Sequence, residues 1–430
     1  MKTLKCTLLI ALSTLVLFSC KEDLEADLYE VSVQLIYPED YTVSDSVLVF
    51  LGDYSAYSDS TGLATFEVPA GTYTISASET RPINGSFYNF NASTSVSVAT
   101  DLMAELSLSV SKSSQLIIKE LYIGGCPKDD GSGTFTRDAY IILYNNSELV
   151  AEIDTNVCLA FAFPYNSNST NKYLDENGNL THEDWIPASV ALWHFQTSLS
   201  LQAGEQILIP IYQAIDHTGT YSKSVDLSDS ENFPMYDVGA FDNTSYYAAP
   251  SEKIPTSHYL NAIKYGIGSA WPLSSSSPAI FLFATEDMGP AAFAADAERT
   301  DYYGGSSNQV SQKVPIDWVI DAVDVFRQGY NDSNNKRFPD DIDAGYVTFT
   351  NGYGYSVYRN VDQEATEAIA ENEGLLVYNY SNGTDDLVDG STDASGIDAE
   401  ASIANGARII YKDSNNSSYD FHQRAIVSIK

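Results

Sequence analysis

The sequence predicts an all-β protein in which a small N-terminal β-sandwich is followed by a larger one with long insertions. Short stretches in which apolar and polar residues alternate recur along the 430 residues, and a period of two is typical of strands with one buried face. Turns rich in Gly, Pro, Asn and Asp separate these stretches, and the N-terminal ones show no helical period. The length suits two or three domains.

Residues 1–19 have the layout of a signal peptide. Two lysines give a positive start, and the apolar run that follows, residues 8–18, is too short to span a bilayer. Small Ser19 then precedes Cys20. A plain secretory signal with an incidental cysteine is the alternative.

The segment 17–20, Leu-Phe-Ser-Cys, resembles the lipobox of bacterial lipoproteins. This resemblance implies that Cys20 carries a diacylglyceryl group on its sulfur and becomes the first residue of the mature chain. Residues 20–28 form an acidic anchor linker that resembles the export tag of Bacteroidota surface lipoproteins. The resemblance implies lipid attachment to the outer membrane, facing the cell exterior; a linker without address value is the alternative.

The chain is strongly acidic, with 58 acidic against 22 basic residues and a formal net charge of −36. Phosphate backbones and anionic headgroups repel such a polyanion, which argues against nucleic-acid binding and polybasic membrane contact. The acids are spread along the chain, and aromatic and aliphatic residues are plentiful. We therefore expect a folded body and not a disordered acidic tail.

Two cysteines remain once the signal peptide and the acylated Cys20 are set aside. Cys126 and Cys158 would close a loop of about thirty residues, and a disulfide between them would contribute on the order of 3 kcal/mol by the chain-entropy model. Two buried free thiols are the alternative. A zinc site would need more ligands at close spacing than these two offer.

Residues 29–112 contain the strands of the first unit. Val31, Val33 and Leu35 alternate with polar residues, as in a half-buried strand. Further stretches of strand character follow, and together about seven short strands predict a β-sandwich. They lie at residues 47–51, 64–68, 73–77, 95–98 and 104–110.

The segment 59–75 carries a more specific pattern. A turn at Gly62 leads into one strand, and Pro69, Gly71 and Tyr73 lead into the next. This pattern resembles the carboxypeptidase-regulatory-like, transthyretin-like modules. We expect Gly62 and Gly71 to adopt turn conformations that other residues resist. The resemblance implies a spacer that holds the main body away from the membrane.

A different pattern occupies residues 115–430. Residues 116–125 and 138–147 are expected to be neighbouring strands, and they resemble the opening of lamin-tail-like immunoglobulin-fold domains. Residues 201–209 and 412–421 resemble a later turn-and-strand and the closing segment of the same family. A lamin-tail domain is much shorter than this region, so the resemblance implies a β-sandwich with long insertions.

The insertions are expected to hold mostly strands and turns. Residues 279–283 are typical of a buried strand. Residues 345–349 and 354–358 predict a hairpin around the Asn-Gly pair at 351–352. Residues 362–371 predict a short acidic helix.

No catalytic constellation stands out in the sequence. The five histidines show no pair at metal-binding spacing, and the Gly-Ile-Gly-Ser-Ala segment at 266–270 lacks the spacing of a serine-nucleophile elbow. A glycosidase would need two carboxylates facing across a cleft, and sequence cannot choose such a pair among 58 acids. We therefore expect no enzyme activity.

Calcium is the one cofactor that the sequence leaves open. Oxygen ligands cluster on turns, which suits a hard cation: Asp175, Asn177 and Asn179 in one turn, and the acids of 385–389 in another. Neither cluster completes a known loop motif. Solvated turns are the alternative, and the sequence requires no cofactor.

Thirty tyrosines are an unusual number, and some stand in loop-like, Gly- or Asn-rich surroundings. A flat ring with a polar tip suits recognition of sugars or other extracellular ligands. Tyrosine is also a good strand residue, which is the structural alternative. The candidate contact residues are Tyr246, Tyr247, Tyr302, Tyr303, Tyr353 and Tyr355.

Taken together, the lipobox, the transthyretin-like module and the expanded body resemble an uncharacterised family of Bacteroidota surface lipoproteins encoded beside TonB-dependent receptors. The resemblance implies a non-enzymatic accessory or ligand-binding component of a nutrient uptake system, with such a receptor as its partner. The sequence does not name the extracellular ligand. A structural or adhesive surface protein is the alternative, and a hydrolase is a more remote one.

Overall fold

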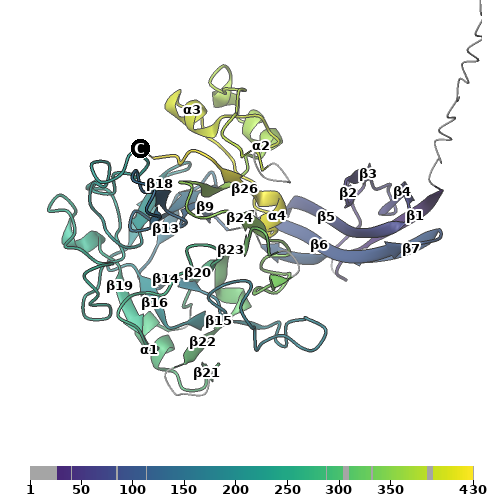
Figure 1. Ribbon diagram of the computed structural model, residues 1–430. Helices are drawn as coiled ribbons and strands as arrows, with labels where there is room; N and C mark the ends of the chain where they lie inside the picture. Colours follow the sequence, from purple (N-terminus) through teal and green to yellow (C-terminus); the bar gives the residue numbers. More distant parts are fainter. Residues whose placement is uncertain are drawn as a thin grey trace, which may run out of the picture.

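The computed structural model describes residues 27–39, 41–83, 86–112, 114–286, 288–303, 309–330, 333–384 and 391–429. The expected signal peptide and Cys20 lie outside these residues. The chain is mostly β, with several antiparallel sheets and few helices. Figure 1 shows a smaller body, built from the start of the chain, beside a larger one built from the rest. In the described residues, no helix has the length and apolar content needed to cross a membrane.

Two sheets form the described part of the N-terminal unit. Their strands are β1 (Leu28–Ile36), β2 (Leu48–Leu51), β3 (Tyr54–Tyr57), β4 (Leu63–Pro69), β5 (Gly71–Ile83), β6 (Ser86–Val98), β7 (Leu102–Ser107) and β8 (Ser109–Lys112). One sheet has the order β4-β1-β7 and the other has the order β3-β2-β5-β6-β8. β1 is antiparallel to β4 and parallel to β7.

The alternation expected in the first strand is confirmed. Val31, Val33 and Leu35 are at most 1% exposed, and they belong to a hydrophobic cluster to which both sheets contribute. β5 and β6 have 13 residues each and pair along their whole length, so these strands are longer than the sequence indicated. The described unit has eight strands where about seven were expected.

The two turn glycines of this unit differ. Gly62 has φ +81°, and its turn is closed by the carboxylate of Asp59, which accepts the N–H groups of Thr61 and Leu63. Gly71 begins β5 without a positive φ, and the Tyr73 ring lies 3.2 Å from the position of a Cβ there. The expected turn conformation is confirmed at Gly62 and wrong at Gly71, which begins a strand and where the close ring is the constraint.

Two large sheets and several small ones form the main body. The strands of the large sheets are β9 (Leu116–Tyr122), β12 (Tyr140–Asn145), β14 (Val157–Phe161), β16 (Ala191–His194), β18 (Gln206–Pro210), β19 (Asn261–Lys264), β20 (Ala279–Ala284), β23 (Val319–Arg327), β24 (Val347–Phe349), β25 (Ser356–Arg359) and β26 (Phe421–Arg424). The orders are β18-β12-β9-β25-β26 and β19-β16-β14-β20-β23-β24. The expected neighbours β9 and β12 do pair.

Three small sheets complete the described part of this body. Their strands are β10 (Cys126–Pro127), β11 (Thr134–Phe135), β13 (Ala151–Ile153), β15 (Trp185–Ser189), β17 (Leu199–Leu201), β21 (Thr300–Tyr302) and β22 (Val310–Pro315). They form the pairs β10-β11 and β13-β17 and the three-stranded sheet β15-β22-β21.

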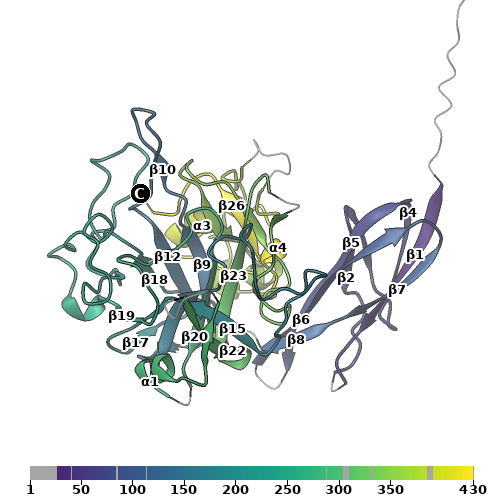
Figure 2. The same ribbon diagram turned by 60° about the horizontal axis from the view of Figure 1, so that its bottom comes forward.

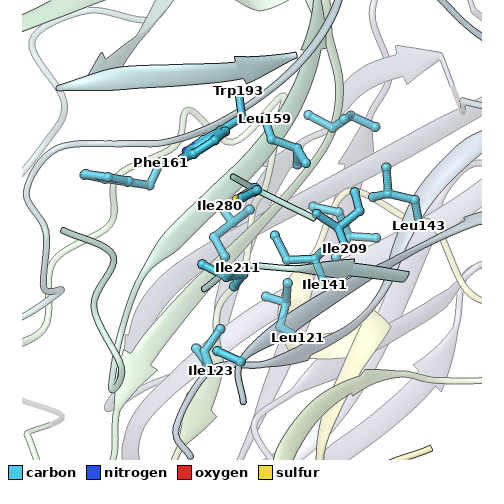
Figure 3. Packing of buried hydrophobic residues seen from close by; sticks show 14 of the residues in the cluster. Leu121, Ile123, Ile141, Leu143, Leu159, Phe161, Trp193, Ile209, Ile211 and Ile280 are labelled. Carbon is cyan, nitrogen blue, oxygen red and sulfur yellow. The ribbon is translucent and has the colours of Figure 1, made fainter. Parts of the chain in front are cut away.

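The largest hydrophobic cluster lies between the two large sheets. Figure 3 shows side chains from both sheets pointing toward one another, among them Ile141 of β12 and Leu159 of β14. β20 is buried on both faces: Ile280 and Leu282 join this cluster, while Phe281 and Phe283 join another on the outer face of the same sheet. Burial on two faces explains the continuous apolar run that predicted this strand.

Helices are short and lie outside the large sheets. They are α1 (Pro290–Ala295), α2 (Gln363–Glu367), α3 (Ala399–Ala404), α4 (Ser417–Asp420) and the 3-10 turns η1 (Thr256–His258), η2 (Ile316–Trp318) and η4 (Ala370–Asn372). Asp362 caps α2 by accepting the N–H of Ala365, and Asp398 caps α3 in the same way. The acidic helix expected at 362–371 is confirmed as α2 followed by η4.

The hairpin expected around residues 351–352 is wrong. β24 pairs in parallel with β23, whereas β25 pairs with β9 and β26 in the other large sheet. Val347 and Phe349 fill the cluster between the sheets, and Ser356–Arg359 are buried throughout. Burial in two different sheets prevails over the local turn preference.

The N-terminal unit meets the main body through a small set of contacts. The Phe50 and Tyr419 rings stack with centroids 5.6 Å apart, and the amide of Asn91 donates to the carbonyl of Ser414. In Figures 1 and 2, β1 and β4 lie at the end of the unit that points away from the main body.

Candidate ligand-binding site

The six candidate tyrosines occupy three separate places. Tyr247 is 2% exposed, whereas Tyr302 and Tyr353 are 57% and 56% exposed. Tyr246, Tyr303 and Tyr355 are half-buried. The structure therefore does not gather all six on one surface.

Tyr247 is a core residue. Its ring belongs to the cluster between the large sheets, and its hydroxyl accepts the N–H of Trp271 at 3.2 Å. Burial raises the pKa of Tyr247 above its usual value. The structural alternative therefore accounts for this tyrosine.

Tyr302 and Tyr303 lie at the three-stranded sheet. Tyr303 stacks on Phe163 with centroids 4.2 Å apart, and its hydroxyl lies 2.6 Å from that of Tyr165. Tyr302 is exposed, and its carbonyl accepts from Lys172. The contacts of Tyr303 hold the loop that contains residue 165. Tyr302 is the one exposed ring of the pair.

Tyr246 lines a small pocket at one end of the space between the large sheets. The pocket volume is about 80 Å³, and its lining combines rings, aliphatic side chains and hydroxyls. The lining residues are Ile123, Thr136, Arg137, Ala139, Tyr212, Tyr246, Leu273, Ser274 and Ser275. None of these side chains is a carboxylate, an imidazole or a thiol.

Arg137 is the only cation among these lining residues. Its guanidinium carbon lies 3.6 Å from the centroid of the Tyr246 ring, a stacked cation–π contact. Nε donates to the carbonyl of Ser245 at 2.9 Å, and Nη1 donates to Oγ1 of Thr136 at 2.8 Å. These bonds fix the guanidinium plane against the ring.

Two consecutive glycines shape the loop beside this pocket. Gly125 has φ +67°, and a Cβ there would lie 1.9 Å from the carbonyl oxygen of Phe135, so only glycine fits. The carbonyls of Gly124 and Gly125 accept the N–H groups of Gly352 and Gly354 at 3.0 and 2.9 Å. This pairing holds the 350–355 loop next to Ile123.

Tyr353 and Tyr355 lie on that loop. Their rings stack with centroids 5.4 Å apart and planes 23° from parallel. Tyr353 is exposed, and Lys223 lies near the next residue, with its Cδ 3.9 Å from the Cβ position of Gly354. The pocket at Arg137 and the Tyr353–Tyr355 ring pair, of which only Tyr353 is exposed, form the candidate site.

Sequence reasoning found three of the tyrosines of this site and missed Arg137 and Tyr212. Tyr212 is 7% exposed and contacts the Tyr246 ring at 5.2 Å. Nothing in the local sequence marks either residue, because the pocket brings together segments more than a hundred residues apart. The one available signal is that Arg137 is a basic residue placed just before a buried strand in an acidic chain.

Cys126 and Cys158 are free buried thiols in the structure, so the disulfide considered from the sequence is not formed. The physical reason is their placement on different sheets. Cys126 lies beside Tyr122, which packs on the outer face of the five-stranded sheet. Cys158 packs in the cluster on the outer face of the six-stranded sheet. The body between the two faces separates the sulfurs.

The turn considered for calcium uses its carboxylate internally. Asp175 accepts the N–H groups of Asn177 and Asn179 at 2.8 and 2.9 Å, and these bonds lower the pKa of Asp175. The second cluster, with Asp385, Asp386 and Asp389, lies outside the described residues. Over the part of the chain that is described, no group of three or more His, Cys, Asp and Glu side chains could hold a metal ion.

Comparison with known proteins gives a family match and a similar solved structure. No curated protein matches the chain. A DUF3823 protein from Parabacteroides merdae ATCC 43184 is 14% identical over 41% of this chain and 81% of its own, with a TM-score of 0.16. A DUF1812 protein from Bacteroides thetaiotaomicron VPI-5482 is 13% identical over 37% and 65%, with a TM-score of 0.15.

The better match is the crystal structure of a DUF4876 family protein from Bacteroides thetaiotaomicron VPI-5482. It is 20% identical, and the alignment covers 91% of this chain and 94% of that one with a TM-score of 0.50. The fold of this mostly β chain is thus similar to that of the crystal structure. Residues 202–395 match the model of the family described as a protein of unknown function, DUF4876.

Proposed function

We propose that this protein is a non-enzymatic, ligand-binding lipoprotein on the outside of the outer membrane. The lipobox at Cys20 and the acidic linker support the anchor. The arrangement in Figure 1 supports a spacer role for the transthyretin-like unit, because β1, which follows the linker, lies at the end of the unit away from the main body. In this proposal the lamin-tail-like body carries the binding site outward.

The pocket at Arg137 is the observation that carries the proposal. It pairs a fixed cation with aromatic rings and hydroxyls, a combination that binds small polar molecules. Its lining has no carboxylate, imidazole or thiol to act as general acid, general base or nucleophile, which supports binding over hydrolysis at this site. In this proposal the exposed Tyr353 ring, on the loop bonded to Gly124 and Gly125, adds a second contact surface.

The partner in this proposal is a TonB-dependent receptor, to which the protein delivers an extracellular nutrient. The net charge of −36 supports a protein or small-molecule partner over nucleic acid. A structural or adhesive role is the alternative function. Growth and attachment assays distinguish it from a role in nutrient uptake.

Intact cells test the location. Protease added outside should degrade the wild-type protein, and mass spectrometry should find a diacylglyceryl group on Cys20. A Cys20→Ala variant should be lost from the membrane fraction. A bare sulfur, or a protein untouched by protease, contradicts the proposed anchor or its outward orientation.

Deletion strains test the function. Loss of the gene should slow growth on one nutrient class and leave growth on simple sugars unchanged, and the tagged protein should copurify with a TonB-dependent receptor. Altered attachment with normal growth on every nutrient would instead indicate the adhesive role.

A further inference from the structure

We infer that the pocket at Arg137 recognises a single acidic sugar residue at the end of a glycan, with its carboxylate at the guanidinium. This inference rests on the proposed function and narrows it to a substrate class. Three steps lead to it: the unused hydrogen-bonding capacity of Arg137, its charge surroundings, and the size and lining of the pocket.

Arg137 has hydrogen-bond donors to spare. A guanidinium has five N–H groups, and here one goes to the carbonyl of Ser245 and one to Thr136. The Nη2 atom makes no hydrogen bond to any described residue. Carboxylates bind the edge of a guanidinium with two parallel bonds, so the free edge matches that group.

Arg137 also lacks a charge partner. No carboxylate oxygen of the described residues lies within 4.0 Å of its nitrogens, whereas Arg337, Arg359 and Arg81 are each paired with an acid. Arg327 and Arg424 also lack such a partner among the described residues, but neither lines this pocket. A bound acid would supply the missing negative charge.

The size and lining of the pocket indicate what kind of molecule carries the carboxylate. Its volume of about 80 Å³ corresponds to about three water molecules, so it admits the carboxylate end of a terminal residue while the rest of that residue lies at the pocket mouth. The Thr136 and Ser275 hydroxyls and the Tyr212 and Tyr246 rings are complementary to the hydroxyls and apolar edges of a sugar. The acidic protein as a whole repels a polyanion, which favours one acidic residue on a neutral glycan.

The test uses the full-length lipoprotein solubilised from the outer membrane and three probes in calorimetry. They are a neutral oligosaccharide ending in one glucuronic acid, its methyl ester, and a peptide with a free C-terminal carboxylate. The acid should bind about tenfold or more tightly than its ester and the peptide. Added salt should weaken the binding of the acid and leave the binding of the ester unchanged.

Variants connect this preference to Arg137. Arg137→Gln should bring the acid to the affinity of the ester, and Arg137→Lys should keep part of the preference. Arg299→Gln is the matched control, because Arg299 also lies over an aromatic ring, 4.7 Å from Trp318, but outside the pocket. Melting curves show that each variant is folded.

Each outcome decides the inference. Equal binding of acid and ester, or an Arg137→Gln variant that keeps the preference, overturns it and leaves the proposed function standing. Stronger binding of the peptide overturns the assignment to a sugar. Absence of binding to all three probes also overturns the inference, and the deletion strains then judge the proposed function separately.

Discussion

Arg337 and Asp324 form an ion pair in which both side chains are 0% exposed. Nη2 and Nε of Arg337 donate to Oδ1 at 2.6 and 3.1 Å, and the backbone N–H of Arg337 donates to Oδ2 at 2.9 Å. Other guanidinium hydrogens reach the carbonyls of Ser277 and Val325 at 2.7 and 2.8 Å. The pair therefore fixes the segment at residue 337 against β23 and the entry to β20.

Arg337→Met should destabilise the main body by about 3–5 kcal/mol, because it leaves the Asp324 carboxylate buried with only Lys336, 3.8 Å away, as a cation neighbour. The double variant Arg337→Met with Asp324→Leu should recover part of that loss, since it also removes the carboxylate that had lost its guanidinium. Urea denaturation followed by tryptophan fluorescence reports on this body, because all four tryptophans lie in it.

Arg408→Met is the control for this experiment. Arg408 pairs with Glu148, whose side chain is 81% exposed, at 3.1 Å. The loss should stay below about 1 kcal/mol. A similar small loss for Arg337→Met would contradict the role assigned to the buried pair.

Sequence patterns predicted the strands wherever burial follows a simple period. Val31, Val33 and Leu35 alternate in sequence and in the structure, and the run at β20 is buried on both faces. β9 shows where the period fails. Its register shifts opposite Ile142 and Leu143, so that Lys119 is an extra residue, and Lys119 and Glu120 are both buried. No sequence signal announces such a bulge.

The candidate site was predictable only in part, for a related reason. The local sequence of Tyr246-Tyr247 suggests two equivalent loop residues, yet one ring lines the pocket and the other fills the core. The inward ring, Tyr247, accepts the backbone N–H of Trp271, which the local sequence of the pair does not indicate. Arg137 is recognisable as a site residue only through its contact with Tyr246, which lies more than a hundred residues away in the sequence.

Asp138 should make stability depend on pH. Burial raises the pKa of Asp138 from its usual 3.8 to about 6, although its Oδ2 accepts the hydroxyl of Tyr122 at 3.0 Å. Because the folded-state pKa is raised, the folded protein holds this proton more tightly. The resulting stability is fully present below about pH 4 and is lost as pH rises through about 6, and it corresponds to about 3 kcal/mol.

Asp138→Asn keeps the acceptor for Tyr122 and removes the titration. The variant should be more stable than the wild type at pH 8 and similar at pH 4, and the difference should change between these limits. Glu298→Gln, an exposed position, should follow the wild type. Parallel curves for Asp138→Asn and the wild type would show that this carboxyl does not titrate as described.

The thiols of Cys126 and Cys158 should not react with thiol reagents in the folded protein. Burial raises the pKa of Cys126 to about 12 and raises that of Cys158 as well, so neither forms the reactive thiolate at neutral pH. A thiol reagent should label no cysteine in the native mature protein and two per chain in guanidinium. Ser132→Cys, at an exposed turn, is the control and should react at once. Labelling of none after denaturation would reveal a disulfide.

Truncation of two tyrosines from the same set of candidates should have a large effect on stability in one case and a small effect in the other. Tyr247→Ala should lower the free energy of unfolding by about 3–5 kcal/mol, because its ring fills the core and its hydroxyl serves Trp271. Tyr353→Ala should change that free energy by no more than about 0.5 kcal/mol, since the ring is 56% exposed. Urea denaturation of both variants measures the difference.

Tyr353→Ala should nevertheless weaken ligand capture by the intact protein, because the proposed site includes this exposed ring, on the loop held by Gly124 and Gly125. Tyr302→Ala is its matched control: Tyr302 is equally exposed, at 57%, but belongs to the three-stranded sheet. Loss of capture in the first variant alone would place the binding surface at the pocket. Loss in the second alone would move that surface to the Tyr302 side, since both substitutions remove the same ring and leave the core untouched.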